Sequence, residues 1–394
     1  MLTRRTLLGL ATLSFWGAAA RAADWPSVIA AARGETVYFN AWAGSETVNA
    51  YIAWAAAEVG QRFGITLNHV KIADTAEVVR RVRDEVRAGQ QQGSVDLVWI
   101  NGQNFRAMKG EHLLFGPFAE TLPNFRFVDT AGKPTTRLDF GEPVEGFESP
   151  WGMAQLTFFG DGAKIAKPPL SMRELIGFAT ARKGRVTYPA PPDFHGTTFV
   201  KQVLAETASD PAALAEPVTE AGFATRWAPA LALLDELRPS LWREGKQYPQ
   251  SQAQVTQMLA DGELAMALTF NPSEPANLVA KGALPRSTIA WQHAKGTIGN
   301  THFLAIPVNA RAPAAAQVVA DFLLSPKAQA RKADIAVWGD PTVLALASLA
   351  PADAALFGTT ATGGIVRFPA PSIPEPHASF VPLIERAWLA RYGA

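Results

Sequence analysis

The sequence predicts an α/β protein built around a parallel, doubly wound sheet, and two observations lead to this fold class. Between residues 35 and 100, runs typical of strands alternate with runs typical of helices. The chain is also long and apolar, with 394 residues of which 48% are hydrophobic and 18% charged. A chain of this size and composition can bury a core in each of two domains, which excludes global disorder.

The N-terminal region supplies three predicted strands and two predicted helices. β-branched and aromatic residues predict strands at 36–40 and 65–70, and a continuous apolar run predicts a buried strand at 95–100. Apolar residues at helical spacing predict a helix between each pair of strands. Because short loops join these elements, the strands are expected to be parallel. Ligands of such sheets bind at the carboxyl ends of the strands, here residues 40–45 and 101–104.

A second region of strands and helices follows residues 116–150, which are rich in Pro, Gly and charge and are expected to form an irregular connection. The pattern predicts strands at 155–159, 184–188, 264–270 and 301–307, and helices at 172–180, 197–206, 225–236, 251–260, 314–324 and 380–389. This alternation predicts a second α/β unit.

The first 22 residues have the features of a cleaved export signal. Arg4 and Arg5 precede a short apolar stretch, and an A-x-A cleavage site ends at Ala22. The paired arginines resemble a twin-arginine signal, but ordinary secretory signals carry such pairs too, so the export route stays open. No later apolar run is long enough to span a bilayer. We therefore expect a soluble, exported protein.

Net charge and cysteine content narrow the chemistry further. The formal net charge is +1, and removal of the signal, which holds three Arg and no acidic residue, brings it to −2. This balance argues against a nucleic-acid partner, which would need a basic face. The lack of cysteine excludes disulfides, thiolate nucleophiles and cysteine-bound metals.

No catalytic motif stands out in the sequence. There is no G-x-S-x-G elbow, no phosphate-binding loop, no G-x-G-x-x-G and no H-E-x-x-H. The six histidines are scattered without the spacing of metal ligands. We therefore expect a binding protein that is not an enzyme and that needs no cofactor or metal. A secreted hydrolase with a carboxylate pair is the alternative, because Asp and Glu are plentiful.

Several segments, taken in order, resemble the bacterial extracellular solute-binding proteins of ABC transporters. They are similar to the family-1-like group, which includes the YnjB-type binding proteins beside iron, polyamine and thiamine binders. The segments that carry the resemblance are spread over nearly the whole chain after the signal: 38–45, 96–105, 168–175, 183–189, 258–267 and 320–329.

The resemblance implies a two-lobed periplasmic binding protein of type II-like fold, with the ligand in a cleft between the lobes. The N-terminal lobe is expected to hold residues 23–148 and 299–338, and the C-terminal lobe residues 149–298 and 339–394. It also implies a free periplasmic protein, expected to be a monomer, that delivers its ligand to the permease subunits of an ABC import system. The iron-binding branch uses paired tyrosines, and no such pair is visible here.

Twelve residues are candidates for ligand contact because of their places beside strands or at helix starts. Trp42 follows the first strand, and Trp151 lies where the resemblance places the first crossover, so we expect the two indoles on opposite lobes, clamping the ligand. The other candidates offer polar groups or close backbone approach: Gly44, Ser45, Asn101, Gly102, Asn104, Thr197, Thr198, Asn271, Asn300 and His302.

Each candidate also has an ordinary structural explanation. Asn and Gly serve turns, Thr serves helix caps, and indoles cover cores. The aromatic residues together with carboxylates fit a thiamine-like or polyamine-like cation, and the same aromatics fit the face of a sugar. Four carboxylates are possible partners of a cation, although solvated surface positions are the more ordinary expectation for them: Glu145, Glu148, Asp161 and Asp193.

Overall fold

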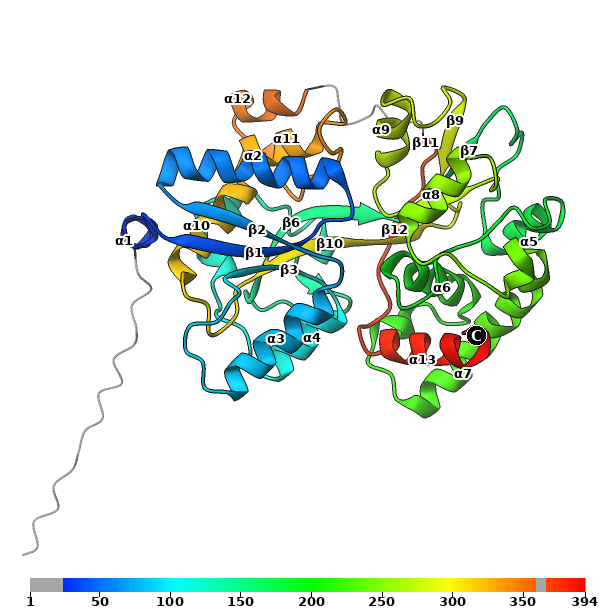
Figure 1. Ribbon diagram of the computed structural model, residues 1–394, viewed down its shortest axis with the longest axis horizontal. Helices are drawn as coiled ribbons and strands as arrows, with labels where there is room; N and C mark the ends of the chain where they lie inside the picture. Colours follow the sequence, from blue (N-terminus) through cyan, green and yellow to red (C-terminus); the bar gives the residue numbers. More distant parts are fainter. Residues whose placement is uncertain (1–23, 359–365, 394) are drawn as a thin grey trace, which may run out of the picture.

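The computed structural model describes residues 24–358 and 366–393, which form two α/β lobes lying side by side (Figure 1). The expected export signal, residues 1–22, lies outside the described residues. Each lobe has its own sheet and its own large buried core. Within the described ranges, no helix has both the length and the apolar character that crossing a membrane requires.

The first lobe begins with the strand order that the sequence predicts. β1 (Thr36–Trp42) lies between β2 (Thr66–Ile72) and β3 (Leu97–Ile100), and both neighbours run parallel to it. The expected parallel arrangement is therefore confirmed. Helices cover both faces of this sheet, with α2 (Glu46–Phe63) on one face and α3 (Thr75–Arg87) and α4 (Gln103–Gly110) on the other (Figure 1).

The remaining helices of the first lobe come from both ends of the chain. They are α1 (Trp25–Ala32), α10 (Pro313–Leu324), α11 (Pro326–Ala333) and α12 (Pro351–Ala354). The sequence predicts α10 to within one residue, since the expected helix at 314–324 lacks only the proline with which α10 begins.

Two long strands connect the lobes. β6 (Glu148–Gln155) and β10 (Thr297–Ala305) pair antiparallel with each other, and β10 also pairs antiparallel with β3. Only Leu156 separates β6 from the first strand of the second lobe. The short strand β12 (Ser372–Ile373) pairs with the start of β10. Residues up to Phe357 pack in the first core, and the described chain from residue 366 joins the second sheet.

The second lobe has a smaller, mixed sheet. β7 (Thr157–Asp161) pairs antiparallel with β8 (Ala267–Thr269) and β9 (Thr288–Trp291), and β11 (Val366–Phe368) pairs parallel with β9. The helices of this lobe are α5 (Met172–Thr180), α6 (Phe194–Thr207), α7 (Glu220–Leu237), α8 (Gln252–Ala260), α9 (Glu274–Ala280) and α13 (Phe380–Tyr392).

Residues 116–147 are irregular, as expected, with short 3₁₀ turns and one small hairpin, β4 (Leu138–Asp139) and β5 (Glu142–Pro143). The expectation is wrong for residues 148–150, which already belong to β6. The predicted strand at 184–188 is wrong. Gly184 lies in a turn, and residues 185–188 form no strand. The backbone groups of this segment bond single positions elsewhere in the chain, as in the bond from the Trp242 N–H to the Val186 oxygen. The apolar side chains that suggested a strand point into the second core instead.

Both cores combine residues that are far apart in the sequence. In the first core, side chains between Ala32 and Leu67 pack with those between Leu304 and Phe357. In the second, side chains between Ala154 and Ile298 pack with α13. The lobe boundaries expected from the resemblance stay a prediction.

Candidate functional site

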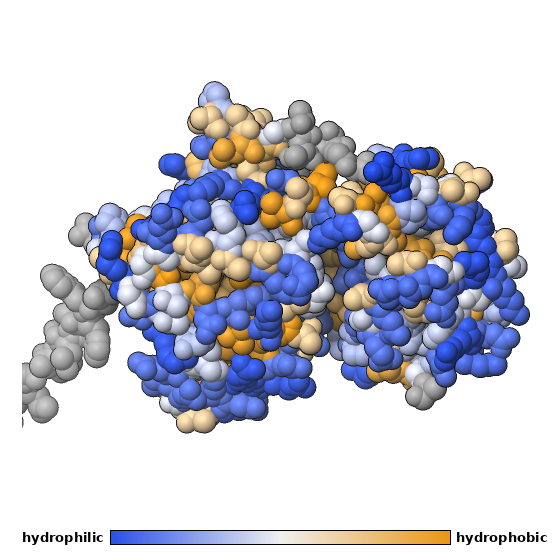
Figure 2. All heavy atoms as spheres, turned by 45° about the horizontal axis from the view of Figure 1, so that its top comes forward, coloured by the Kyte–Doolittle hydropathy of each residue, from blue (hydrophilic) through white to orange (hydrophobic). Residues whose placement is uncertain are grey.

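The carboxyl ends of β1 and β3 and the start of α4 face the second lobe (Figure 1). This is the edge of a doubly wound sheet at which ligands bind. Figure 2 shows the surface notched between the two lobes. Two groups of side chains lie near this junction, and both include residues that the sequence marks as candidates.

The first group is a set of five polar side chains, which we call the polar cluster: Asn101, Asp139, Lys201, Asn300 and Glu375. Lys201, on α6 of the second lobe, places Nζ 2.6 Å from Oε2 of Glu375, which follows β12. Nδ2 of Asn300, on β10, donates to Oε1 of the same carboxylate at 3.0 Å. The side chains of Lys201 and Glu375 are only 1% and 2% exposed. Groups from both lobes therefore meet in one buried network.

The hairpin of β4 and β5 brings Asp139 and Phe140 from the first lobe into this junction. The backbone N–H of Gly102, at the start of α4, donates to Oδ2 of Asp139 at 2.5 Å. Phe140 and Gly141 form the tip with φ of 47° and 79°, the two positive angles of a type I′ turn. The Phe140 ring then lies 4.4 Å from Nζ of Lys201. A side chain at Gly102 would collide with this ring, so the close approach requires glycine.

Burial determines the electrostatics of the polar cluster. Removal from water raises the pKa of Asp139 well above its usual value, and the nearby charge of Glu375 adds to the rise. The hydrogen bond from the Gly102 N–H, the charge of Lys201 and the neighbouring Asn101 amide oppose this rise without cancelling it. Burial also raises the pKa of Glu375, although Lys201 and Asn300 favour its ionised form. The single buried ammonium therefore does not fully compensate the carboxylates around it.

Glu148, at the start of β6, adds a further buried carboxylate near Asp139. Its side chain is fully buried, and both carboxylate oxygens have no hydrogen-bond partner. Burial raises the pKa of Glu148 well above its usual value, and the charge of Asp139 contributes to the rise. The expectation of a solvated surface position for Glu148 is wrong, because β6 is a paired strand of the first sheet and Glu148 is 0% exposed.

The second group is the aromatic cluster, which consists of Trp42, Trp99, Trp151, His302 and Trp338. Ring centroids are 6.5 Å apart for Trp42 and Trp99, 5.0 Å for Trp99 and Trp151, 5.6 Å for Trp151 and Trp338, and 5.1 Å for Trp99 and His302. Several of these contacts are edge-to-face, a geometry that aromatic pairs prefer. Trp42 and Trp99 are partly exposed, whereas Trp151 is fully buried.

A buried ion pair between Lys332 and Asp340 contacts two members of the aromatic cluster, Trp151 and His302. Nζ of Lys332 lies 2.6 Å from Oδ2 of Asp340 and also donates to the backbone oxygen of Trp151. Nε2 of His302 lies 2.9 Å from Oδ1 of Asp340, so this nitrogen carries the ring proton that the carboxylate accepts. Lys332 and His302 outweigh burial and lower the pKa of Asp340, while burial lowers the pKa of Lys332.

The structure brings several predicted candidates to these two clusters. Asn101 and Asn300 belong to the polar cluster and Gly102 adjoins it, whereas Trp42, Trp151 and His302 belong to the aromatic cluster. The expectation that Trp42 and Trp151 lie on opposite lobes is wrong. Trp151 packs in the first core, 5.0 Å from the Trp99 ring that also contacts Trp42. The reason is that β6 belongs to the first sheet until the chain leaves it.

Other candidates have partners within the protein. Nδ2 of Asn271 donates to the backbone oxygen of Trp338 at 3.1 Å, which ties the second lobe to the aromatic cluster. The hydroxyls of Thr197 and Thr198 bond Glu385 and the Phe194 oxygen. The carboxylate of Asp193 caps the N–H groups at the start of α6. Gly44, Ser45 and Asn104 lie at or just before the starts of α2 and α4, and none of the three is buried.

Sequence reasoning missed the charged centres of both clusters. Lys201 and Gln202 interrupt the apolar residues in the middle of α6, and Glu375 stands between two prolines. Asp139 directly precedes the hairpin tip, where Gly141 is a visible turn signal. Each signal exists in the sequence, but none shows that the three residues come together, because their contacts link distant segments.

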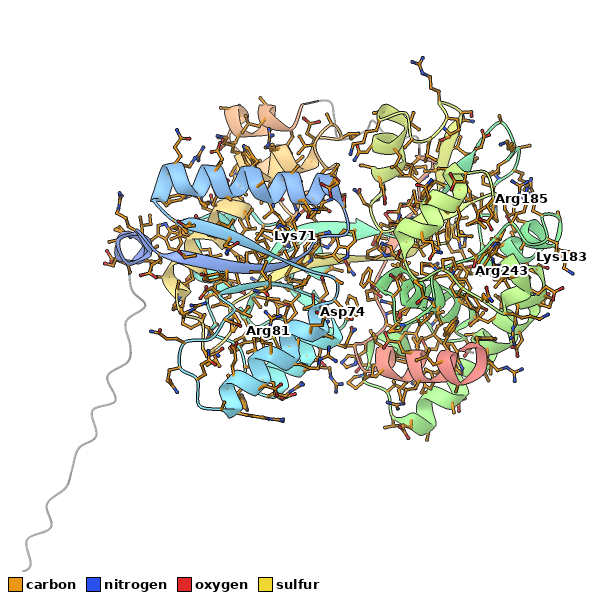
Figure 3. The ribbon with its side chains drawn as sticks, viewed as in Figure 1. Lys71, Asp74, Arg81, Lys183, Arg185 and Arg243 are labelled. Carbon is orange, nitrogen blue, oxygen red and sulfur yellow. The ribbon has the colours of Figure 1, made fainter. Side chains whose placement is uncertain are left out.

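Other polar features lie away from the junction. A cavity of about 170 Å³ in the second lobe is lined in part by Lys164, Arg182 and Arg185. Figure 3 shows Lys183, Arg185 and Arg243 on the side of the second lobe that faces away from the first. Among the described residues, no group of three or more His, Asp and Glu side chains is arranged to hold a metal ion.

Comparison with known proteins decides the family. The family model described as bacterial extracellular solute-binding protein matches residues 54–357. The chain belongs to this family. The protein YnjB of Escherichia coli (strain K12) is 46% identical over 388 residues, which cover 98% of each chain. The resemblance stated from the sequence is therefore confirmed.

Solved structures of periplasmic binding proteins share the fold. AfuA of Actinobacillus pleuropneumoniae, solved with fructose 6-phosphate bound, has a TM-score of 0.62 and 15% identity, covering 91% of this chain and 99% of its own. The spermidine/putrescine substrate-binding protein PotD of Streptococcus pneumoniae has a TM-score of 0.60 and 12% identity, covering 90% and 99%. The two-lobed fold class is confirmed. The family and these structural neighbours are binding proteins rather than enzymes.

Proposed function

We propose that this solute-binding protein captures a small polar organic ligand between its lobes and delivers it to the permease of an ABC import system. The observation that carries the proposal is the polar cluster. Its Lys201, on the second lobe, pairs with Glu375 and lies against the ring of Phe140, which belongs to the hairpin of the first lobe. A buried charged network at a lobe junction is costly to assemble and is found where ligands are recognised. Family membership supports the same role.

The mechanism is closure of the two lobes about the strands that join them. The ligand favours the closed form because it contacts both lobes only in that form. Asn101, Gly102 and Asn300 supply contacts at the polar cluster, and the partly exposed Trp42 supplies an aromatic contact at the aromatic cluster. The remaining candidates in reach of the junction are Gly44, Ser45, Asn104, Asn271 and His302.

The cellular setting follows from the same assignment. Cleavage after Ala22 releases a free monomer into the periplasm, with the twin-arginine route as one path of export. The ligand classes that fit are a thiamine-like or polyamine-like cation and a sugar.

The test is to identify what the protein carries. The full chain is purified from the periplasm without unfolding, and small molecules released by denaturation are analysed by mass spectrometry. Recovery of one intact compound in near-stoichiometric amount is the expected result. Turnover of added glycosides or esters by the purified protein would instead support the hydrolase alternative and overturn the proposal.

Small-angle scattering then checks the closure. The compound that is recovered is removed by reversible unfolding and added back to the refolded protein. Closure predicts a smaller radius of gyration with the compound than without it. An unchanged radius with saturating compound would contradict the two-lobe mechanism.

A further inference from the structure

The polar cluster contains more buried hydrogen-bond acceptors than it can satisfy. Oδ1 of Asp139 and Oδ1 of Asn300 are both buried and have no partner. The orientation of the Asn300 amide is fixed, because its nitrogen must face the Glu375 carboxylate to which it donates. The only cation of the cluster, Lys201, is engaged by Glu375 and by the ring of Phe140.

Glu148 adds two more buried acceptors without a donor. Its two carboxylate oxygens are buried without a hydrogen-bond partner, and Asp139 is close enough to influence its ionisation. The one cation that acts on Glu148, Lys109, is bonded to the Pro143 oxygen and to Glu145 instead. A buried acceptor without a donor is unfavourable, and a buried unpaired carboxylate more so.

The sign of this surplus selects the ligand chemistry. A donor group relieves unpartnered acceptors, and a positive charge also relieves the excess of carboxylates over ammonium. An anionic group would find no free cation, since it would have to displace Glu375 from Lys201. A neutral hydroxyl would supply hydrogen bonds but no compensating charge.

We propose that the polar cluster binds a positively charged nitrogen group of the ligand through Oδ1 of Asp139 and Oδ1 of Asn300, which makes the ligand an organic cation. This inference rests on the proposed function. The protein already binds one of its own cations here in the same way. The Lys201 ammonium pairs with the Glu375 carboxylate and lies 4.4 Å and 5.5 Å from the rings of Phe140 and Phe194. Carboxylate and aromatic faces together favour a cation.

The decisive variant is Asp139→Asn. It keeps the shape of the side chain and an oxygen that accepts from the Gly102 N–H, but it removes the charge. Asp84→Asn is the matched control, because it removes the same charge from an exposed position on α3 of the same lobe. The melting temperature of each ligand-free variant shows whether it folds. Asp139→Asn is expected to melt no lower than the parent, since burial disfavours the ionised form of the carboxyl group that the substitution removes.

Two measurements test the proposal. The compound released from the natively purified parent is expected to be retained by a cation exchanger at neutral pH. Titration of tryptophan fluorescence with spermidine, thiamine, maltose and inorganic phosphate is expected to show saturable binding of a cation only. Asp139→Asn is expected to weaken that binding about tenfold or more, as loss of a charged hydrogen bond does, while Asp84→Asn leaves it unchanged.

The outcomes separate this inference from the proposed function. Saturation by maltose or phosphate alone, or release of a neutral or anionic compound, would overturn the cation assignment and leave solute binding intact. Equal affinity of Asp139→Asn and the parent for the bound cation would overturn the role of Asp139. Release of no compound and binding of no probe would overturn the proposed function, and the inference with it.

Discussion

The ammonium of Lys332 and the carboxylate of Asp340 lie 2.6 Å apart with side chains that are 0% and 2% exposed, so they form an ion pair removed from water. His302 on β10 and the backbone oxygen of Trp151 on β6 complete the network. The pair therefore joins α11 and the segment after it to the two strands that connect the lobes.

Replacement of Lys332 by methionine is expected to destabilise the protein strongly. The substitution leaves Asp340 buried without its main cation, a change that costs about 3–5 kcal/mol in comparable sites. Urea unfolding measures the loss. Lys327→Met is the control, because the Lys327 side chain is 47% exposed and ion pairs at the surface contribute about 1 kcal/mol or less. Similar losses in the free energy of unfolding for both variants would show that the buried pair contributes no more to stability than the surface pair.

Gly152 on β6 tests how tightly this network is packed. A Cβ at this position would collide with the Asp340 carboxylate and the Lys332 ammonium, so Gly152→Ala is expected to cost about 1–3 kcal/mol. Gly177→Ala inside α5 meets open space and is expected to stabilise by about 0.5–1 kcal/mol, because alanine favours helix. Thermal unfolding of the two variants should therefore shift in opposite directions. A shift in the same direction would contradict the packing described for Gly152.

Trp151 and Trp42 are expected to respond differently to truncation. Trp151 is fully buried in the first core, so Trp151→Ala should remove about 3–5 kcal/mol of stability. Trp42 is partly exposed at the junction, so Trp42→Ala should cost less stability and should weaken ligand binding. Melting temperature and affinity, measured on both variants, decide the matter. Unchanged affinity in Trp42→Ala would remove this indole from the site.

Asp321 on α10 predicts a particular dependence of stability on pH. Burial raises the pKa of Asp321 to about 6, although the backbone and side-chain N–H groups of Asn124 donate to it. The folded protein then binds a proton that the unfolded chain has lost, so this group's contribution to stability falls as the pH rises from about 4 to about 6.

The change Asp321→Asn removes that titration. Urea unfolding of parent and variant at several pH values between 4 and 7 isolates its effect as the difference between the two profiles. We expect the difference to shift in favour of the variant as the pH rises. Parallel profiles over this range would show that Asp321 has an ordinary pKa.

Local patterns in the sequence predict much of the fold. The alternation from Thr36 to Ile100 predicts three parallel strands, and the helix predicted at 172–180 has the bounds of α5. The failure at 184–188 has a physical cause: β-branched residues favour extended backbone, but only a neighbouring strand makes it part of a sheet. That neighbour is set by tertiary contacts that no local pattern contains.

The candidate site is predicted less completely than the fold. Asn101 and Asn300 are found because strand ends mark the binding edge of the sheet, which is a general property of the fold. Lys201, Glu375 and Asp139 are missed because each is defined by partners from another segment. Trp151 is placed on the wrong lobe because no local pattern shows with which of the two sheets a connecting strand pairs.

The position of β10 has a consequence for the order in which the protein can be built. This strand pairs with β3 and with β6 in the first sheet, yet it is synthesised after β7, β8 and β9 of the second. A growing chain therefore holds β1 to β3 with an open edge until most of the second lobe has emerged. The second lobe in turn receives β11 and α13 last. Neither lobe can mature ahead of the other, so the two assemble as interlocked units rather than one after the other.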